Sequence, residues 1–298
     1  MRKITILLIL VLVIRSGYSQ QLHFTSQYLQ HNSMYNPAAA GISNEGGMVG
    51  ISYRSQWSSF PGNPRTFMLY GDFALPKLKA GLGAYIYRDE TGPTSRTGIQ
   101  LAYSYHVRTG EVGRLGLGIE LRALQYAVDK SKLNISNDDP ILGGDDKKLA
   151  IDAGAGVYWT NDKLSVGVAV SQLIQSKLEL ANVPNSTEGG KLYRHYNLTA
   201  NYRLQTGENI YLIPNAMVRV IEHSPTEFDF GMKMDFQDKL WWALNWRVKQ
   251  FWSFQAGFKL LQRVRLTYSY DYYQTPISFF SGGSGAHEIG LRFGFKKK

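Results

Sequence analysis

Apolar and polar side chains alternate along this chain from Gly46 almost to its end. Between Ile99 and Val107, for example, the odd positions are mostly apolar, and Gln100 and His106 stand at even positions. A period of two is typical of β-strands that have one face in an apolar medium and the other in a polar one. Because the pattern persists over most of the sequence, we expect an all-β protein.

Turn-forming residues divide this pattern into segments that are long for a soluble protein. There are about fourteen segments of roughly 10–14 residues, whereas soluble strands average ~5–6 residues and a tilted strand that crosses a bilayer needs ~9–11. They are residues 46–58, 64–75, 79–89, 95–108, 113–127, 150–160, 163–174, 194–206, 208–222, 226–236, 240–249, 252–261, 264–274 and 286–296. We therefore predict a transmembrane antiparallel up-and-down β-barrel of about fourteen strands over residues 46–298.

The connections between these segments are alternately short and long, as they are in outer-membrane barrels with short periplasmic turns and longer outer loops. The predicted short turns are Pro76–Leu78, Thr109–Val112, Asn161–Asp162, Gly207, Gln237–Lys239 and Gln262–Arg263. The three longest predicted loops are Asp129–Leu149, Gln175–Tyr193 and Thr275–Gly285. This parity predicts that the N- and C-termini both lie in the periplasm.

The first residues have the pattern of an export signal. Two basic residues are followed by an apolar run at Ile4–Ile14, in which Thr5 is the one polar residue, and then by the small residues Gly17 and Ser19. This order predicts a secretory signal peptide over residues 1–19 that is cleaved after export. The alternative is an uncleaved anchor helix, but the run is shorter than the ~20 apolar residues that a membrane span needs.

Composition narrows the possible functions. The chain has no cysteine, so disulfides, thiolate metal sites and thiol nucleophiles are excluded. Its formal net charge is +10, but the basic residues are scattered through the alternating segments, and we expect no nucleic-acid partner because no basic patch forms. Ser104 and His106 share one strand face, yet there is no Gly-x-Ser-x-Gly motif and no metal-ligand spacing. We therefore expect no enzyme activity, no catalytic residue, no cofactor and no metal site.

Aromatic residues gather near the predicted strand ends. We expect them to form the interfacial girdles of a membrane barrel, with packing inside the sheet as the alternative. They are Trp57, Tyr85, Tyr87, Trp159, Trp241, Trp242, Trp252, Tyr272 and Tyr273.

Charged residues occupy the polar register of the strands. They predict either charge ladders that fill the barrel, which we favour, or the lining of an anion-selective channel. The basic ones are Arg54, Arg122, Arg203, Arg219, Lys233, Arg247, Arg265 and Arg292, and the acidic ones are Asp72, Glu120, Asp152, Asp229, Asp235, Asp271 and Glu288.

Two segments do not fit the barrel wall. Residues 20–45 contain a proline that cannot donate to a sheet, and we expect an ordered periplasmic lead-in. Its candidate partner-contact residues are Tyr35, Asn36, Pro37, Ala38 and Gly41; the alternative is a plug or turn that closes the barrel base. In the loop at 137–146, the carboxylates of Asp138, Asp139, Asp145 and Asp146 suggest a Ca²⁺ site, but their spacing favours a solvated acidic loop.

Several motifs resemble one known family. The mature N-terminus carries Phe24-Thr25-Ser26-Gln27-Tyr28, then Tyr35-Asn36-Pro37-Ala38 and Gly41, and the first strand carries Tyr53-Arg54-Ser55-Gln56-Trp57. Weaker matches follow at Pro64 and Thr66, Gly71-Asp72, residues 87–93 and residues 152–158. Together they resemble the PorP/SprF family, which consists of outer-membrane barrels of the Bacteroidota type IX secretion and gliding systems. The most specific part is the Asn-Pro-Ala segment followed by the strand with Tyr53, Arg54, Gln56 and Trp57.

The resemblance implies a structural and docking role in the outer membrane, surrounded by its lipid. It implies periplasmic and lipoprotein subunits of the type IX secretion machine as partners, and anchoring of a secreted adhesin that carries a type IX C-terminal signal. It leaves open whether the chain serves the core machine or one dedicated substrate. From the residues alone, a passive porin or small-solute transporter is the alternative.

Overall fold

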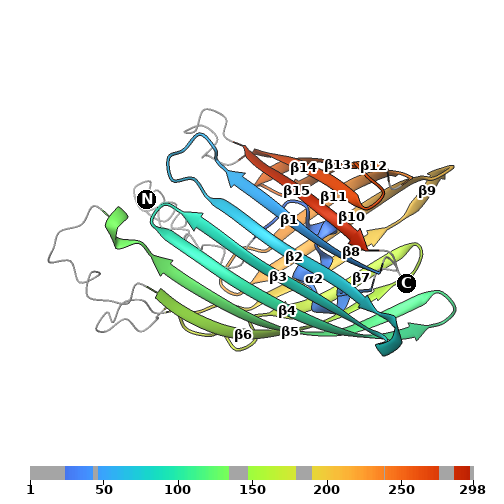
Figure 1. The fold of residues 1–298 in the computed structure, drawn as a ribbon, viewed down its shortest axis with the longest axis horizontal. Coiled ribbons are helices and arrows are strands. Elements are labelled where there is room, and N and C mark those ends of the chain that lie inside the picture. Colours follow the sequence, from blue (N-terminus) through green and yellow to red (C-terminus); the bar gives the residue numbers. More distant parts are fainter. Residues whose placement is uncertain are drawn as a thin grey trace, which may run out of the picture.

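The computed structural model describes residues 24–42, 46–133, 147–178, 190–237, 239–274 and 285–295. Its strands form one antiparallel sheet that closes on itself, because β1 pairs with both β2 and β15 (Figure 1). In chain order the strands are β1 (Gly47–Gln56), β2 (Arg65–Leu75), β3 (Ala80–Thr91), β4 (Thr94–Thr109), β5 (Gly113–Val128), β6 (Lys147–Thr160), β7 (Leu164–Ser171), β8 (His195–Tyr202), β9 (Leu204–Gly207), β10 (Ile210–Ile221), β11 (Glu227–Phe236), β12 (Leu240–Arg247), β13 (Phe251–Lys259), β14 (Val264–Tyr273) and β15 (Ala286–Phe295).

The wall is fourteen strands wide, as predicted. Strands β8 and β9 both pair with β10, and only Arg203 separates them in the sequence. They are therefore two parts of one interrupted strand. Every other strand pairs with its neighbours in the sequence. The all-β, antiparallel up-and-down barrel is therefore confirmed.

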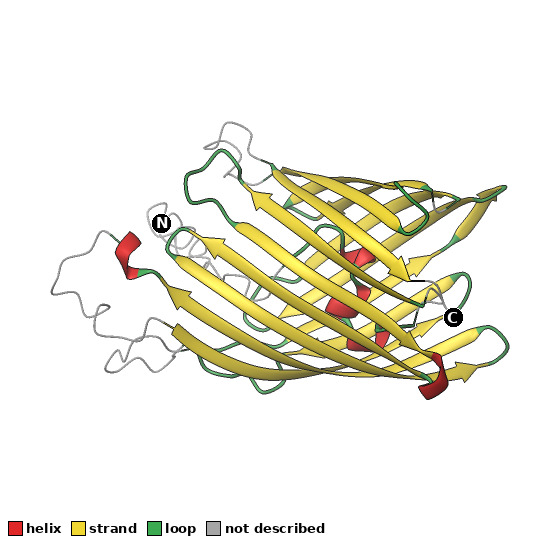
Figure 2. Cartoon of the chain, in the orientation of Figure 1, coloured by secondary structure: helices red, strands yellow, loops and turns green. Residues whose placement is uncertain are grey.

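The five helices among the described residues are short and are not part of the sheet. They are η1 (Tyr28–Gln30), α2 (Asn32–Tyr35), η2 (Pro37–Ala39), η3 (Pro76–Leu78) and η4 (Lys130–Lys132). Helix η3 is a turn at one end of the barrel, whereas η1, α2 and η2 lie within it (Figure 2). No helix among the described residues is long and apolar enough to cross a membrane.

The two ends of the barrel differ in their connections. One end, which we call the short-turn end, carries η3 and the tight turns that follow β4, β6, β9, β11 and β13. Strands β5, β7 and β14 end, and β6, β8 and β15 begin, at the opposite end. This is the parity that the sequence predicted, and it places the entry into β1 and the end of β15 at the short-turn end.

The two faces of the wall follow the alternation in the sequence. On β4, Leu101 is 55 % exposed on the outer face, whereas Gln100 and Ser104 on the inner face are 3 % and 0 % exposed. A continuous outer belt of exposed Ile, Leu, Val, Phe and Tyr would be unstable in water but is stabilised in lipid.

The predicted aromatic girdles are only partly correct. Trp242 and Tyr272 are exposed on the outer face, but four of the nine residues are buried in the lumen: Tyr85, Tyr87, Trp241 and Tyr273. They stand on the inward register, where large side chains fill a lumen that would otherwise be empty. Proximity to a strand end indicates the headgroup level, but the register decides which side of the wall a ring faces.

Some predicted features lie outside the described residues. These are the signal peptide over residues 1–19 and the acidic loop at 137–146 with Asp138, Asp139, Asp145 and Asp146.

Candidate functional site

Residues 24–42 lie inside the barrel and are buried or half-buried throughout; we call this segment the plug (Figures 1 and 2). Asn36 begins its last helical turn by accepting a hydrogen bond from the Ala38 N–H at 3.0 Å, and Pro37 occupies the first position of that turn. Proline suits this position because its φ is preset and no N–H is needed there. Gly41 then turns the chain with φ +60°, a conformation that glycine adopts without strain.

The hydrogen bonds of the plug run around the whole inner circumference. They reach β1 to β8, β10, and β12 to β15. Arg122 donates to the Met34 carbonyl at 2.9 Å, Gln100 to the Ser33 carbonyl at 3.2 Å, and Asn197 to the Tyr35 carbonyl at 3.2 Å. These bonds matter because a buried backbone carbonyl outside a helix or sheet needs a partner.

One part of the wall holds the first residues of the plug through charge; we call it the charged wall (Arg54, Arg247, Asp271 and Glu288). Ser26 Oγ donates to Asp271 at 2.5 Å, and Thr25 Oγ1 donates to Glu288. Arg54 donates to Asp271 at 2.6 Å and to Ser26 Oγ at 2.8 Å. The two plug residues and the three wall residues that make these bonds are all buried, so water cannot replace the bonds.

The ring of Phe24 lies against three guanidinium groups. Its centroid is 3.8 Å from the Arg247 Cζ, 5.2 Å from the Arg54 Cζ and 5.7 Å from the Arg219 Cζ. Cations in this position are attracted to the face of an aromatic ring. Each of the three arginines also pairs with a carboxylate. Arg247 lies 2.9 Å from Asp229, Arg54 lies 2.6 Å from Asp271, and Arg219 lies 3.1 Å from Glu227.

The opposite part of the wall holds the end of the plug through shape; we call it the glycine wall (Gly81, Gly116, Gly118, Gly156 and Gly167). A Cβ at Gly116 or Gly118 would overlap the backbone of Ala38, and one at Gly81 would overlap that of Ala40. Gly156 and Gly167 leave room in the same way for the amide of Asn36. Glycine is required here because the plug backbone approaches the sheet directly.

The predicted partner-contact residues all lie inside the lumen. Tyr35, Asn36, Pro37, Ala38 and Gly41 are buried, and Asn36 donates to two carbonyls of the wall, in β6 and β7. Their observed contacts are thus with the chain itself, which fits the alternative of a plug. A partner would reach them only if the plug left the barrel.

The motif strand β1 divides between the two faces. Arg54 points to the plug, whereas Tyr53 is 43 % exposed on the outer face. Gln56 and Trp57 end the strand: the backbone N–H of Gln56 donates to the Pro64 carbonyl at 2.9 Å and that of Trp57 to the Gly285 carbonyl at 2.9 Å. Of this motif, Arg54 bonds directly to the plug, and Trp57 packs against the same buried cluster as Phe24 of the plug.

The lumenal charges form ladders, the alternative that the sequence favoured. Besides the charged wall, Arg122 pairs with Glu120 at 2.7 Å and Lys233 pairs with Asp235 at 3.0 Å. Arg203 differs, because it lies in the break between β8 and β9, is exposed and stacks on Tyr211 at 3.7 Å.

Several residues that hold the plug were not singled out as such from the sequence. Ser104 donates to the Ala38 carbonyl at 2.8 Å and His106 Nε2 lies 3.0 Å from the Ala40 carbonyl, so both contact the plug. The sequence did not predict the glycine wall. Gly116 and Gly118 stand at positions where other strands have polar residues, but this pattern does not indicate what fills the space of the missing side chains.

Comparison with known proteins identifies the family. The family described as "Type IX secretion system membrane protein PorP/SprF" matches residues 17–293. No curated protein sequence matches the chain. Among solved structures, the CymD monoaromatic hydrocarbon channel is similar with a TM-score of 0.50 and 10 % identity, over 94 % of this chain and 96 % of that one. Omp33 of Acinetobacter baumannii has a TM-score of 0.49 and 8 % identity, over 84 % and 98 %. At such identities the likeness concerns the barrel fold alone.

Proposed function

The chain belongs to the PorP/SprF family of type IX secretion system membrane proteins, and from this premise we propose that it is a closed, non-enzymatic docking barrel of that machine. In this proposal the barrel stands in the outer membrane with its short-turn end and both termini in the periplasm. It binds periplasmic or lipoprotein subunits of the machine, or anchors a secreted protein that carries a type IX C-terminal signal.

The observation that supports this function is the plug. A porin needs a continuous aqueous path, whereas here residues 24–42 bond to strands around the whole inner circumference. A lumen closed by charged, aromatic and backbone contacts does not serve as a passive channel, but the same contacts make the barrel rigid. A rigid membrane body suits docking better than permeation.

The main experiment is affinity purification of the tagged, full-length chain from native outer membranes. The expected result is co-purification of secretion-machine subunits or of a large secreted protein, at levels well above those with an unrelated tagged barrel of the same membrane. Recovery of neither would count against the proposal.

A planar-bilayer measurement tests the closed lumen separately. The wild type is expected to stay closed, and a variant that lacks residues 24–42 is expected to conduct, provided that it keeps the heat-modifiable folded band on a gel. Large and stable openings of the wild type would favour a porin instead.

A tethered variant shows whether partners need the plug itself. A Cβ added at Gly83 would lie 3.4 Å from the Ala40 Cβ, close to the ~3.5–4.5 Å between the Cβ atoms of a disulfide. Because the chain has no cysteine, Ala40→Cys with Gly83→Cys creates a single tether. Docking at the rim predicts equal partner recovery in the oxidised and reduced forms, whereas contact with Tyr35–Gly41 predicts recovery only after reduction.

A further inference from the structure

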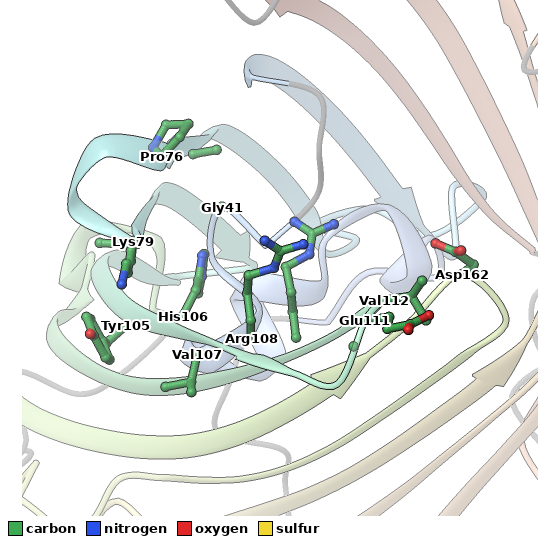
Figure 3. Close-up of a pocket in the computed structure, with 14 residues that line it drawn as sticks. Gly41, Pro76, Lys79, Tyr105, His106, Val107, Arg108, Glu111, Val112 and Asp162 are labelled. Carbon is green, nitrogen blue, oxygen red and sulfur yellow. The ribbon is translucent and has the colours of Figure 1, made fainter.

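A half-open cavity of about 790 Å³ lies at the short-turn end, beside the end of the plug (Figure 3). Its lining comes from Gly41, the end of β2 and the turn that follows it, the end of β4 at Tyr105–Arg108, and the turns that join β4 to β5 and β6 to β7. The volume is in the range of sites that hold small ligands or a few side chains. The charged and titratable residues in its lining are Lys79, His106, Arg108, Glu111, Arg114 and Asp162.

Two arginines stand directly opposite each other in this cavity. Arg108 of β4 and Arg114 of β5 are register partners in the antiparallel ladder. Figure 3 shows Arg108 on the same side of β4 as His106, with Tyr105 and Val107 on the other side. Like charges directly opposite on one sheet face destabilise the pair unless something compensates them.

Compensation by an ion pair within the described part of the chain is missing. No salt bridge of either arginine is found among the described residues, although Glu111 and Asp162 also line the cavity. Arg114 donates to the Ile42 carbonyl at 2.9 Å, which fixes it against the end of the plug. Elsewhere in the lumen the buried arginines of the charged wall each pair with a carboxylate.

The chemistry and the position of Arg108 and Arg114 together indicate which class of ligand they bind. Guanidinium groups bind carboxylates and phosphates through two parallel hydrogen bonds, so the ligand carries such a group. Tyr105 and Val107 line the cavity from the lipid-facing side of β4, whereas Arg114 points inward and donates to the Ile42 carbonyl, so a lipid headgroup would have to pass over the rim to reach both arginines. A peptide segment enters the open mouth directly.

We propose that this cavity, the arginine mouth (Lys79, Arg108 and Arg114), binds a carboxylate of an extended peptide segment from a periplasmic partner. The inference rests on the proposed docking function and specifies its contact. Arg108 and Arg114 hold the carboxylate, Lys79 adds a third positive charge at the rim, and Glu111 and Asp162 select against segments with many negative charges.

The test uses the purified full-length chain in nanodiscs and a fluorescent peptide, Gly-Ser-Glu-Ser-Gly with blocked ends. Its matched control is the same peptide with Gln in place of Glu. Binding is followed by anisotropy for the wild type, Arg108→Gln, Arg114→Gln and the control Arg88→Gln. Arg88 suits the control because it is an exposed arginine, paired with Glu90, far along β3 from this end.

The proposal expects the Glu peptide to bind the wild type and Arg88→Gln equally, and to bind either mouth variant about tenfold or more weakly, as loss of one partner of a charged hydrogen bond implies. The Gln peptide should not bind. Equal binding of the two peptides, no binding by the folded wild type, or equal loss in Arg88→Gln would overturn it.

Glu45 of the same chain is the rival occupant, since it follows Ile42 closely and lies outside the described residues. Binding of the Glu peptide that appears only in Glu45→Gln would assign the mouth to that residue and overturn the proposal. The docking function is judged separately by affinity purification. If Arg108→Gln with Arg114→Gln still recovers every partner, the mouth is not the contact, although the docking function stands.

Discussion

The charged wall and the glycine wall hold opposite halves of the plug by opposite means. The charged wall uses ion pairs and hydroxyl–carboxylate bonds to fix Phe24, Thr25 and Ser26. The glycine wall offers almost no side chains and instead allows the backbone around Ala38 to lie directly on the sheet. The charged wall depends on complete pairing of its charges, and the glycine wall depends on the absence of side chains at its glycines.

This difference teaches where each wall is vulnerable. A buried ion network tolerates small changes of shape but not the loss of one charge, because the remaining charges stay buried without a partner. A close backbone contact is indifferent to charge but fails when a single methyl group is added. Four predictions test this contrast, from the largest expected effect to the smallest.

Loss of the central cation should be the most damaging change at the charged wall. Arg54→Met leaves Asp271 and Glu288 buried without their opposite charge, and we expect the free energy of unfolding to fall by about 3–5 kcal/mol. Urea unfolding in lipid vesicles, followed by tryptophan fluorescence, measures this change. The control Arg88→Met removes an exposed pair with Glu90 and should cost about 0–1 kcal/mol.

A double variant shows that the cost is electrostatic. Adding Asp271→Asn to Arg54→Met removes one of the stranded carboxylates, so the double variant should be more stable than Arg54→Met alone, although both are less stable than the wild type. If the second change only adds to the loss, Arg54 acts mainly through packing.

At the glycine wall, the same substitution should have opposite signs at two positions. Gly118→Ala places a methyl group in the Ala38 backbone, and we expect a loss of about 1–3 kcal/mol and a plug that proteases can cleave. Gly294→Ala in β15 meets only the Arg263 carbonyl oxygen, at an ordinary contact distance of 3.9 Å, so it should stabilise the strand by about 0.5–1 kcal/mol. Equal effects would show that the plug does not lie on Gly118.

Acidification should weaken the middle of the plug, between the two walls. Burial, and to a smaller extent the positive charge of the nearby Arg292, lowers the pKa of His31 from 6.5 to about 3. The neutral imidazole is thus favoured in the folded state. Its contribution to stability is complete above pH 6.5 and is lost as the pH falls toward 3, by up to about 1.4 kcal/mol per pH unit.

The measurement compares unfolding at pH 7.5 and pH 5.0 in the wild type and in His31→Gln. Other groups titrate in both proteins, so the difference between the two slopes isolates His31. The variant should lose less stability on acidification than the wild type. Identical slopes would mean that His31 becomes protonated without leaving its site.

The barrel wall could be predicted from the sequence because its signal is local. Alternation gives the strands and turn residues give their ends; the segment predicted at 95–108, for instance, is β4 at Thr94–Thr109. The interruption at Arg203 was not predicted, since the alternation continues across it. The prediction was wrong for the rings of Tyr85 and Trp241, which face inward, because nearness to a strand end does not indicate which face of the wall a ring lies on.

The plug could not be placed from the sequence, because its position depends on contacts between distant residues. Thr25 and Glu288 are 263 positions apart, and no local pattern links them. Pro37 excluded a regular strand but left both a partner contact and a plug open. Likewise, Gly118 indicates a missing side chain but not the backbone that occupies its place.

The smallest expected effect separates two components of the charged wall, its charge and its aromatic contact. Phe24→Leu keeps most of the apolar volume but removes the ring that faces Arg247 at 3.8 Å. We expect a loss of about 0.5–1 kcal/mol, the scale of a cation–π contact whose cation is already paired. The matched control is Phe254→Leu on the outer face, where the ring is 53 % exposed. Both variants lose the same atoms, but the Phe24 ring also lies 5.7 Å from the Phe251 ring, so an excess loss at Phe24 reports its contacts with the arginines and with Phe251 together. Equal losses would leave the first half of the plug held by Thr25, Ser26 and their carboxylates alone.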